Sequence, residues 1–511
     1  MSRQQRLTLV ATILGSTVVF LDSTVVNVAL PAIADGLDAG LAGQQWVVEA
    51  YMLTLVSLLL VGGSLGDQLG RRRVFVVGLI AFGATSILCA VSPSVELLIA
   101  ARALQGIAGA LLVPGSLAIV AATFEGAARG KAVGTWTAWT GIATVFGPAG
   151  GGALIEALSW RAIFWVNIPL IAATVALTLH SVRESRDPQA FHGVDWLGIV
   201  LSAVGLAGPV LALIEQPTRG WGDPVVWVSM VVGVICFALF VLWEARARHP
   251  MLELSLFRIR NFRVANLTTL AAYAGLIGGL FFVGLFLQQV AGYTALEAGL
   301  ATTPVSLILF FLSPRWGKLA SGTGPRLPMC IGPIVGGIGL VMLLRVGADP
   351  SYVADVLPAI LVFGLGLSAT VAPLTATVLD SVEERHVGIA SGVNNGVSRV
   401  AGLLAVAVLG AVISAKFGAD VGGGAGSNPL TAAEPDASTA AFHLGVFIAG
   451  LLMIAGGIFA GVGIENPKGR VEAVPSRGSA QAGECGHGAD ADCTEPKQLP
   501  PGADAPEPEP A

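Results

Sequence analysis

Two acids and one arginine lie inside long apolar runs, where an ionised side chain is costly. Asp22 falls within the run 8–33, Glu49 lies near the start of the run 46–66, and Arg102 falls within the run 97–121. Asp22 is about 11 residues from the end of its run, hence roughly 16 Å deep in a helix. Apolar surroundings favour an uncharged carboxyl, which suits an acid that carries protons. We expect Asp22 to couple protons or recognise cations; the alternative is a hydrogen-bonded acid that holds two helices together.

Glu49 and Arg102 lie at similar depth, about one turn into two helices that begin at the same face of the membrane. They could therefore form an ion pair, and protonation of Glu49 would break it. A purely structural salt bridge near the lipid head groups is an equally good interpretation of the same residues.

The composition is that of a protein with many membrane spans. Of 511 residues, 54% are hydrophobic and 12% are charged, which is roughly half the charged share of soluble domains. The 66 glycines suit closely packed transmembrane helices. The net charge of −5 does not suggest a nucleic-acid partner, and the five scattered cysteines fit neither a disulfide framework nor a metal site.

Fourteen apolar runs are long enough to cross a bilayer, which takes about 20 helical residues. They are 8–33, 46–66, 74–92, 97–121, 133–155, 161–180, 194–214, 225–243, 265–290, 297–314, 327–346, 353–378, 393–414 and 439–462. With the N-terminus inside the cell, nearly all Lys and Arg fall in inner segments. The exceptions are Arg161, Arg219, Arg345 and Lys416 outside and Arg102 and Arg399 within spans. This bias predicts a multi-pass protein of the cytoplasmic (inner) membrane with both termini cytoplasmic.

The turn 62–73 between the second and third spans combines glycines, one acid and three adjacent arginines. The arginines place it at a membrane surface. Asp67 with Arg71 and Arg72 suggests a gate, because an acid at this surface can face the positive N-terminal end of a helix from the other half of the protein. A topological anchor would account for the arginines but not for Asp67 or the glycines.

The sequence also contains a parallel internal repeat, which predicts an all-α fold of two six-helix bundles plus two inserted helices, with 14 transmembrane helices. The matching patterns are Gly63 to Arg72 with Gly317 to Arg326, Gly141 and Gly147 with Gly396 and Gly402, and Pro114 with Pro373. The expected domains are an N-terminal bundle at 1–186, the inserted pair and a cytoplasmic linker at 187–264, and a C-terminal bundle at 265–464. A polar, low-complexity tail at 465–511 is expected to be disordered and cytoplasmic.

Four motifs carry a resemblance to a known family. They are LDSTVVNVALP at 21–31, the turn from Gly63 to Arg72, RALQGIAG at 102–109, and the glycine pattern at 141–151. With these motifs the chain resembles the major facilitator superfamily, specifically its fourteen-span branch of drug:proton antiporters. The resemblance covers nearly all of 8–462.

The resemblance implies roles for the motif residues. It assigns Arg102 to proton coupling together with Asp22, and Glu49 is an additional acid that suits cationic substrates. The turn is expected to stabilise the outward-facing state, and the fifth-span motif to bend that span where the halves meet. The gating residues are Gly63, Asp67, Gly70, Arg71, Arg72, Gly141, Gly147, Pro148 and Gly151.

Aromatic and amide residues on the spans suit a broad amphipathic pocket, although packing is the commoner role of such residues. The candidates are Gln105, Trp136, Trp139, Tyr273, Phe282, Gln288, Asn394, Asn395 and Arg399. Arg399 lies within a span and needs a partner, which Asp380 or a substrate anion could supply.

The sequence therefore predicts a multidrug efflux transporter that works by alternating access and confers antibiotic resistance. It is expected to exchange protons for amphipathic or cationic small molecules, to act as a monomer in the lipid bilayer, and to need no cofactor besides the proton gradient, because no nucleotide-binding loop occurs. The closest rival is a dedicated exporter of a single metabolite or self-resistance compound. A membrane enzyme would need a catalytic cluster, and a transporter-like receptor would need a sensor domain; neither is evident.

Overall fold

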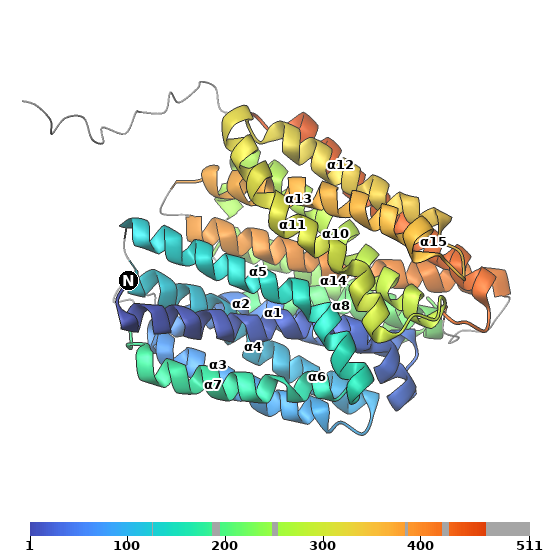
Figure 1. Ribbon diagram of the computed structural model, residues 1–511, viewed down its shortest axis with the longest axis horizontal. Coiled ribbons are helices and arrows are strands. Elements are labelled where there is room, and N and C mark those ends of the chain that lie inside the picture. Colours follow the sequence, from blue (N-terminus) through green and yellow to red (C-terminus); the bar gives the residue numbers. More distant parts are fainter. Residues whose placement is uncertain (125, 187–194, 248–253, 384–386, 422–428, 467–511) are drawn as a thin grey trace, which may run out of the picture. The chain divides into compact units, whose positions relative to one another are not determined.

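The computed structural model describes residues 1–124, 126–186, 195–247, 254–383, 387–421 and 429–466. Within these residues the chain is helical and forms one compact unit that ends at Asn466 (Figure 1). The first half contains α1 (Arg3–Leu37), α2 (Leu41–Leu69), α3 (Arg71–Ala90), α4 (Val95–Thr123), α5 (Gly126–Ala157), α6 (Ala162–Trp165) and α7 (Asn167–Ser181). The pair α8 (Trp196–Arg219) and α9 (Pro224–Glu244) and the short η1 (Leu254–Arg258) follow. The remainder contains α10 (Arg260–Gln289), α11 (Ala295–Thr323), α12 (Arg326–Met342), η2 (Leu343–Arg345), η3 (Tyr352–Val356), α13 (Leu357–Asp380), α14 (Val387–Val421) and α15 (Pro435–Gly463).

Twelve helical segments of the described chain are long and apolar enough to cross a membrane, so the protein is a multi-pass membrane protein. The helices α2 and α5, of 29 and 32 residues, are not among the twelve. The total of fourteen spans therefore stays a prediction, as do the boundaries of the two bundles and the inserted pair. The tail from 467 onward lies outside the described residues.

Local sequence signals explain where several helices begin. Thr294 caps α11 by accepting a hydrogen bond from the Glu297 amide, while the Glu297 carboxylate accepts one from the Thr294 amide. Ser94 caps α4, and Asp223 caps α9 directly before Pro224. Such caps satisfy amide groups that have no partner within the helix.

The described helices of each half pack mainly among themselves. In the first half, α1 packs against α4, α5 and α7, and α2 packs against α4; in the second, α10 packs against α14 and α15, and α12 against α13 and α15. The two sets meet where α5 packs on α11, its neighbour in Figure 1, and where α2 packs on α14. The pair α8 and α9 pack on each other, and α8 also contacts α2 and α14.

The repeated turns have the same backbone in both halves. Gly70 and Gly324, 254 positions apart in the sequence, have φ values of 116° and 90°. The amide of Arg72, just after Gly70, donates to Glu184 Oε1 at 3.0 Å, and the amide of Arg326 donates to Asn466 Oδ1 at 3.1 Å. Positive φ strains any residue with a Cβ, so both turns require glycine.

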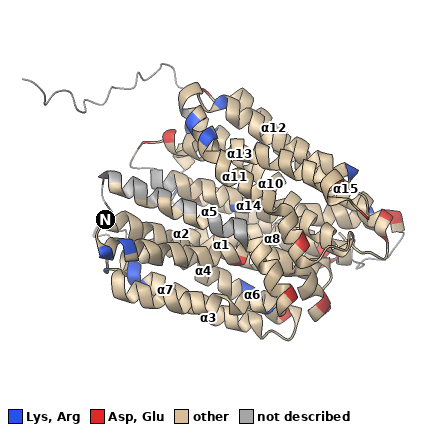
Figure 2. Cartoon of the chain, in the orientation of Figure 1, with Lys and Arg blue, Asp and Glu red and all other residues tan. Residues whose placement is uncertain are grey.

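Charged residues concentrate at the ends of the helices. Many of the described Lys and Arg residues gather at the end of the unit where the N-terminus lies, and acids are prominent at the opposite end (Figure 2). This distribution is the one that the positive-inside rule associates with a cytoplasmic N-terminus. The orientation itself stays a prediction.

Candidate transport site

Asp22 and Arg102 form a buried ion pair. Arg102 Nη1 lies 2.5 Å from Asp22 Oδ2, and each side chain is 1% exposed. The arginine also donates from Nε to the Val47 carbonyl at 3.1 Å, and its guanidinium carbon lies 4.2 Å from the centre of the Tyr51 ring. Both charges are therefore desolvated and held by several partners, which is the condition under which a buried pair is tolerated.

Amide and hydroxyl side chains from three other helices complete the surroundings of Asp22. Its Oδ1 accepts hydrogen bonds from Gln105 Nε2 and from Asn167 Nδ2, each at 3.2 Å. Both amides also donate to Ser86 Oγ, at 2.8 and 3.1 Å. Asp22 thus accepts hydrogen bonds from side chains on α4 and α7, and Ser86 on α3 holds both of those side chains in place.

The expected ion pair between Glu49 and Arg102 is wrong, because Arg102 pairs with Asp22 instead. Glu49 is 1% exposed, and its Oε2 has no hydrogen-bond partner. Glu49 and Arg102 lie at similar depth, as expected, but about two turns into α2 and α4 instead of about one, and α2 turns Glu49 toward a different space. That space is a cavity between the two halves of the protein.

The central cavity has a volume of about 390 Å³ and is lined by α1, α2, α10, α13 and α14. Four of the predicted substrate residues line it together with Glu49: they are Tyr273, Asn394, Asn395 and Arg399. Ser23 and Thr24 also line it, whereas their neighbour Asp22 does not. The ion pair therefore lies behind the cavity wall, and the acid that faces the cavity is Glu49.

Arg399 is the positive counterpart of Glu49 in this cavity. Its only hydrogen-bond partner among the described residues is the Met52 sulfur, 3.8 Å from Nη1. Asp380 is exposed at the end of α13, and no ion pair joins it to Arg399 within the described chain. Of the two partners expected for Arg399, Asp380 and a substrate anion, the substrate anion therefore stays a prediction. Among the described residues, neither the acid nor the base that lines this cavity has an ion-pair partner.

Five other predicted substrate residues lie elsewhere. Gln105 belongs to the Asp22 network, and Phe282 is 1% exposed in the core. Trp136 donates to Ser16 Oγ at 3.2 Å, and Trp139 is 55% exposed. Gln288 donates back to the Gly284 carbonyl. In this conformation none of the five lines the central cavity as far as the structure describes it.

The turn predicted as a gate is described in part. The side chain of Asp67 lies outside the described residues, so its contact with another helix stays a prediction. Gly70 forms the tight turn, and Gly63 lies within α2. Arg72 donates to the Leu179 carbonyl at 3.2 Å, and the Arg71 amide donates to the Ser185 carbonyl at 3.0 Å.

The glycines of α5 allow close approach to two other helices. A Cβ at Gly151 would lie 2.5 Å from Val25 on α1, and one at Gly152 would lie 2.6 Å from the Ala295 carbonyl oxygen on α11. From the other side, a Cβ at Gly299 would lie 2.5 Å from the Pro148 carbonyl oxygen. Gly147 likewise faces Thr24, and the surroundings of Gly141 are outside the described residues. Only glycine fits such backbone contacts.

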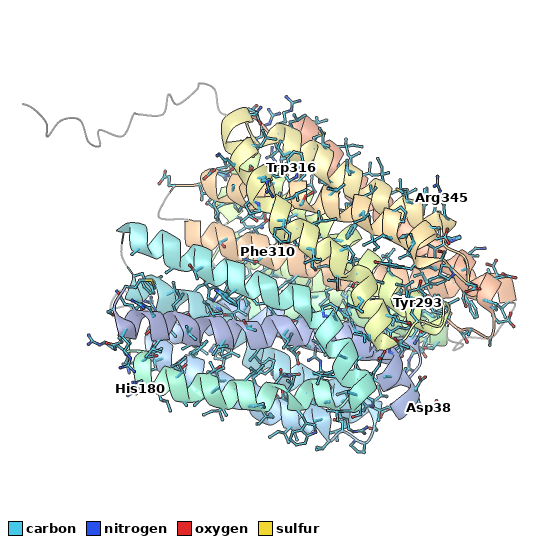
Figure 3. The ribbon with its side chains drawn as sticks, in the orientation of Figure 1. Asp38, His180, Tyr293, Phe310, Trp316 and Arg345 are labelled. Atoms are coloured by element: carbon cyan, nitrogen blue, oxygen red, sulfur yellow. The ribbon has the colours of Figure 1, made fainter. Side chains whose placement is uncertain are left out.

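The sequence did not predict a set of contacts between the two halves near the start of α11 and the start of α2. The Leu296 amide, at the start of α11, donates to Glu156 Oε1 at 3.0 Å. Gln289 Nε2 donates to Gln44 Oε1 at 3.1 Å, and Gln45 Nε2 donates to the Val406 carbonyl at 2.8 Å. All three bonds join the first half to the second. The first two lie where α11 and α2 begin and α10 ends, which is the end marked by Tyr293 in Figure 3 and opposite to the end marked by His180. The third lies at the wall of the central cavity, because Val406 lines it.

Replacing Glu156 with glutamine is expected to favour opening of this end by about twofold, because the negative charge at the start of α11 is lost while the acceptor is kept. Gly299→Leu should act more strongly in the same direction, since its Cβ would collide with the α5 backbone. Electron–electron distances between spin labels at Gly40→Cys and Gly347→Cys, where a side chain meets no neighbour within 4 Å, would measure the opening.

The matched control is Glu297→Gln, because Glu297 caps α11 within its own chain segment and does not reach α5. Label distances that are the same in Glu156→Gln and in the unsubstituted protein would contradict the role of Glu156. So would an equal shift in the Glu297→Gln control.

Comparisons with known proteins agree with this geometry. The sequence profile of the Major Facilitator Superfamily matches residues 12–406. The chain is 36% identical over 420 residues to the multidrug resistance protein Stp of Mycobacterium tuberculosis, covering 82% of this chain and 78% of that protein. It is 34% identical over 414 residues to the tetracenomycin C resistance and export protein of Streptomyces glaucescens, covering 80% and 76%. A solved peptide transporter of the POT family has the same fold, with a TM-score of 0.64, 14% identity, and coverage of 90% and 97%.

Proposed function

The chain belongs to the Major Facilitator Superfamily, and from this premise we propose that it exports amphipathic small molecules, including antibiotics, in exchange for protons. The relatives named for multidrug resistance and for antibiotic export support the direction and the kind of substrate. Family membership indicates a transporter rather than an enzyme. The proposal places the chain in the fourteen-span antiporter branch, in the cytoplasmic membrane, with both termini inside.

The observation that carries the proposal is the buried pair of Asp22 and Arg102 beside the central cavity. Desolvated charges within membrane spans are costly and usually functional. A proton that reaches Asp22 neutralises the carboxylate and weakens its bond to Arg102. The five helices that meet around the pair then change their packing, which links protonation to the position of the first half relative to the second.

Alternating access fits the closure at one end. The bonds of Glu156, Gln44 and Gln45 close the end opposite to the N-terminus. The central cavity extends toward the other end, since Leu379 near the end of α13 and Ser391 near the start of α14 line it. With the predicted orientation, the cavity receives its substrate from the cytoplasm, and opening of the outer contacts releases it outside.

A dedicated exporter of one compound is the second candidate. The relative named for tetracenomycin C resistance and export favours it, and a cavity of about 390 Å³ lies near the lower end of ligand pockets, which run from about 300 to 1,000 Å³. The proton site and the direction of transport would be the same in both candidates. They differ only in the number of compounds that the cavity accepts.

The test is transport by the purified protein in proteoliposomes, with a set of cationic, neutral and anionic amphipathic compounds and an imposed pH gradient. We expect accumulation that follows the pH gradient and collapses with a protonophore. Transport of several unrelated compounds supports multidrug export, and transport of one supports the dedicated exporter. Accumulation that ignores the pH gradient would refute proton coupling.

A further inference from the structure

A second cavity lies beside the helix pair α8 and α9. Its volume is about 550 Å³, within the range of roughly 300 to 1,000 Å³ typical of ligand pockets. Apolar side chains dominate its walls, among them Leu206 on α8, Phe237 on α9 and Leu270 on α10. α2 and α14 close it on the inner side, and it shares no described lining residue with the central cavity.

The position of this cavity is that of one leaflet of a bilayer. It lies near the end of the unit where α8 begins, α9 ends and α10 begins. On α10 its lining runs from Arg263 to Leu270, about 10 Å along the helix axis. Leu267 and Leu270 are also 42% and 39% exposed, so the cavity opens sideways to the surface that faces lipid.

Two buried polar atoms of residues in the walls have no hydrogen-bond partner among the described residues. They are Ser57 Oγ, in a residue that is 8% exposed, and Asn266 Oδ1, in a residue that is 2% exposed. Asn266 Nδ2 donates to the Phe262 carbonyl at 2.9 Å, which leaves Oδ1 as a free acceptor. An occupant made of hydrocarbon alone would leave both groups unsatisfied, which is unfavourable in an apolar cavity. An occupant with a hydrogen-bond donor could satisfy Asn266 Oδ1, which hydrocarbon could not.

Arg263 supplies an unpaired positive charge at the mouth of the cavity. It is exposed and has no ion pair or hydrogen bond among the described residues, whereas Arg260 pairs with Glu465 at 2.6 Å. Arg263 precedes Asn266 by three residues, so the two side chains are neighbours on one face of α10, about 5–6 Å apart at Cβ. A single anionic head group can reach both.

We propose that this cavity binds an anionic membrane lipid. One acyl chain fills the apolar space between α9 and α10, the phosphate pairs with Arg263, and a head-group hydroxyl donates to Asn266 Oδ1. Phosphatidylglycerol has each of these groups. The bound lipid would fill a space bordered by α8, α9 and α10 together with α2 and α14, two helices that belong to different halves of the protein.

Native mass spectrometry of the purified full chain tests the head-group contact. With equal phosphatidylglycerol and phosphatidylcholine added, we expect about fivefold preferential retention of phosphatidylglycerol, the usual effect of one arginine on an anionic lipid. Arg263→Gln should abolish this preference. Arg258→Gln, which removes an exposed charge outside the cavity, should keep it. Equal retention of the two lipids, or an unchanged preference in Arg263→Gln, would overturn the proposal.

A cavity-filling variant tests the location. Gly396 on α14 lines the cavity, and a Cβ added there meets no atom within 4 Å, so Gly396→Leu places its side chain where the acyl chain would lie. We expect this variant to lose lipid retention. Gly418 is on the same helix, also with open space, but lies away from the cavity; Gly418→Leu should bind lipid normally.

Normal lipid retention by Gly396→Leu would place the lipid elsewhere and overturn the proposal. Displacement of bound phosphatidylglycerol by a transported compound would assign the cavity to substrate instead and overturn it as well. The binding measurement needs no transport, so its outcome is independent of the proposed export function.

Discussion

Vesicles that carry the Asp22→Asn variant are expected to show no substrate-driven proton movement, although the protein still inserts into the membrane. Asparagine can keep hydrogen bonds with Gln105 and Asn167, but it carries no exchangeable carboxyl proton. It also leaves Arg102 buried without a counter-charge, and breaking a buried pair costs about 3–5 kcal/mol. Everted vesicles with a pH-sensitive dye would measure the proton movement, and thermal unfolding of the purified variant would measure the stability.

A double variant separates coupling from stability. Asp22→Asn combined with Arg102→Gln removes both charges, so it should regain stability relative to Asp22→Asn alone. It should still lack coupled transport, because the proton site is missing. Full proton-coupled transport by Asp22→Asn would falsify the coupling role, and recovery of coupling in the double variant would reduce Asp22 to a structural acid.

Glu49→Gln is expected to lower the transport of cationic compounds roughly tenfold relative to neutral compounds, which corresponds to about 1.4 kcal/mol. Glu49 is buried, lines the central cavity and has an unpartnered oxygen, so a substrate cation would meet it in a region of low dielectric. Glutamine keeps the size and the hydrogen-bonding capacity and removes only the charge. Initial rates of uptake into everted vesicles, measured for matched cationic and neutral compounds, give the ratio.

Arg399→Gln is the matched variant in the same cavity, on α14 instead of α2. It should weaken transport of anionic compounds and favour cationic ones, because removing a positive charge shifts the potential of the cavity in the opposite direction. If Glu49→Gln lowers neutral and cationic transport equally, Glu49 serves folding or proton movement and not cation recognition.

Much of the helical framework can be predicted from the sequence, because it depends on local properties. Each of the fourteen apolar runs lies mainly on helix, with exceptions chiefly at the run ends, and the matching turns at Gly70 and Gly324 both have a positive φ. Length, hydropathy and glycine positions suffice for these features. The similar depth of Glu49 and Arg102 follows from the same arithmetic of residues per turn, although α2 and α4 begin before the apolar runs do.

Pairing across helices could not be predicted in this way. The position of a residue along a helix does not show which way its side chain points. Two acids, Asp22 and Glu49, could therefore have paired with Arg102. In the structure, α1 packs on α4 so that Asp22 forms the pair. Asn167 lies 145 positions from Asp22, and Glu156 lies 140 positions from Leu296. Nothing in the local sequence joins them, although a lone amide in the apolar run 161–180 was a signal that could have drawn attention to Asn167.

The sequence by itself determined that this chain crosses the membrane many times, that it repeats a helical unit, and which few ionisable residues lie in its spans, because composition and periodicity are sums over neighbouring residues. The tertiary structure alone decided which acid holds Arg102, which acid faces the central cavity, and where a second cavity opens to lipid. Those features depend on how helices rotate and pack against partners that are distant in the chain.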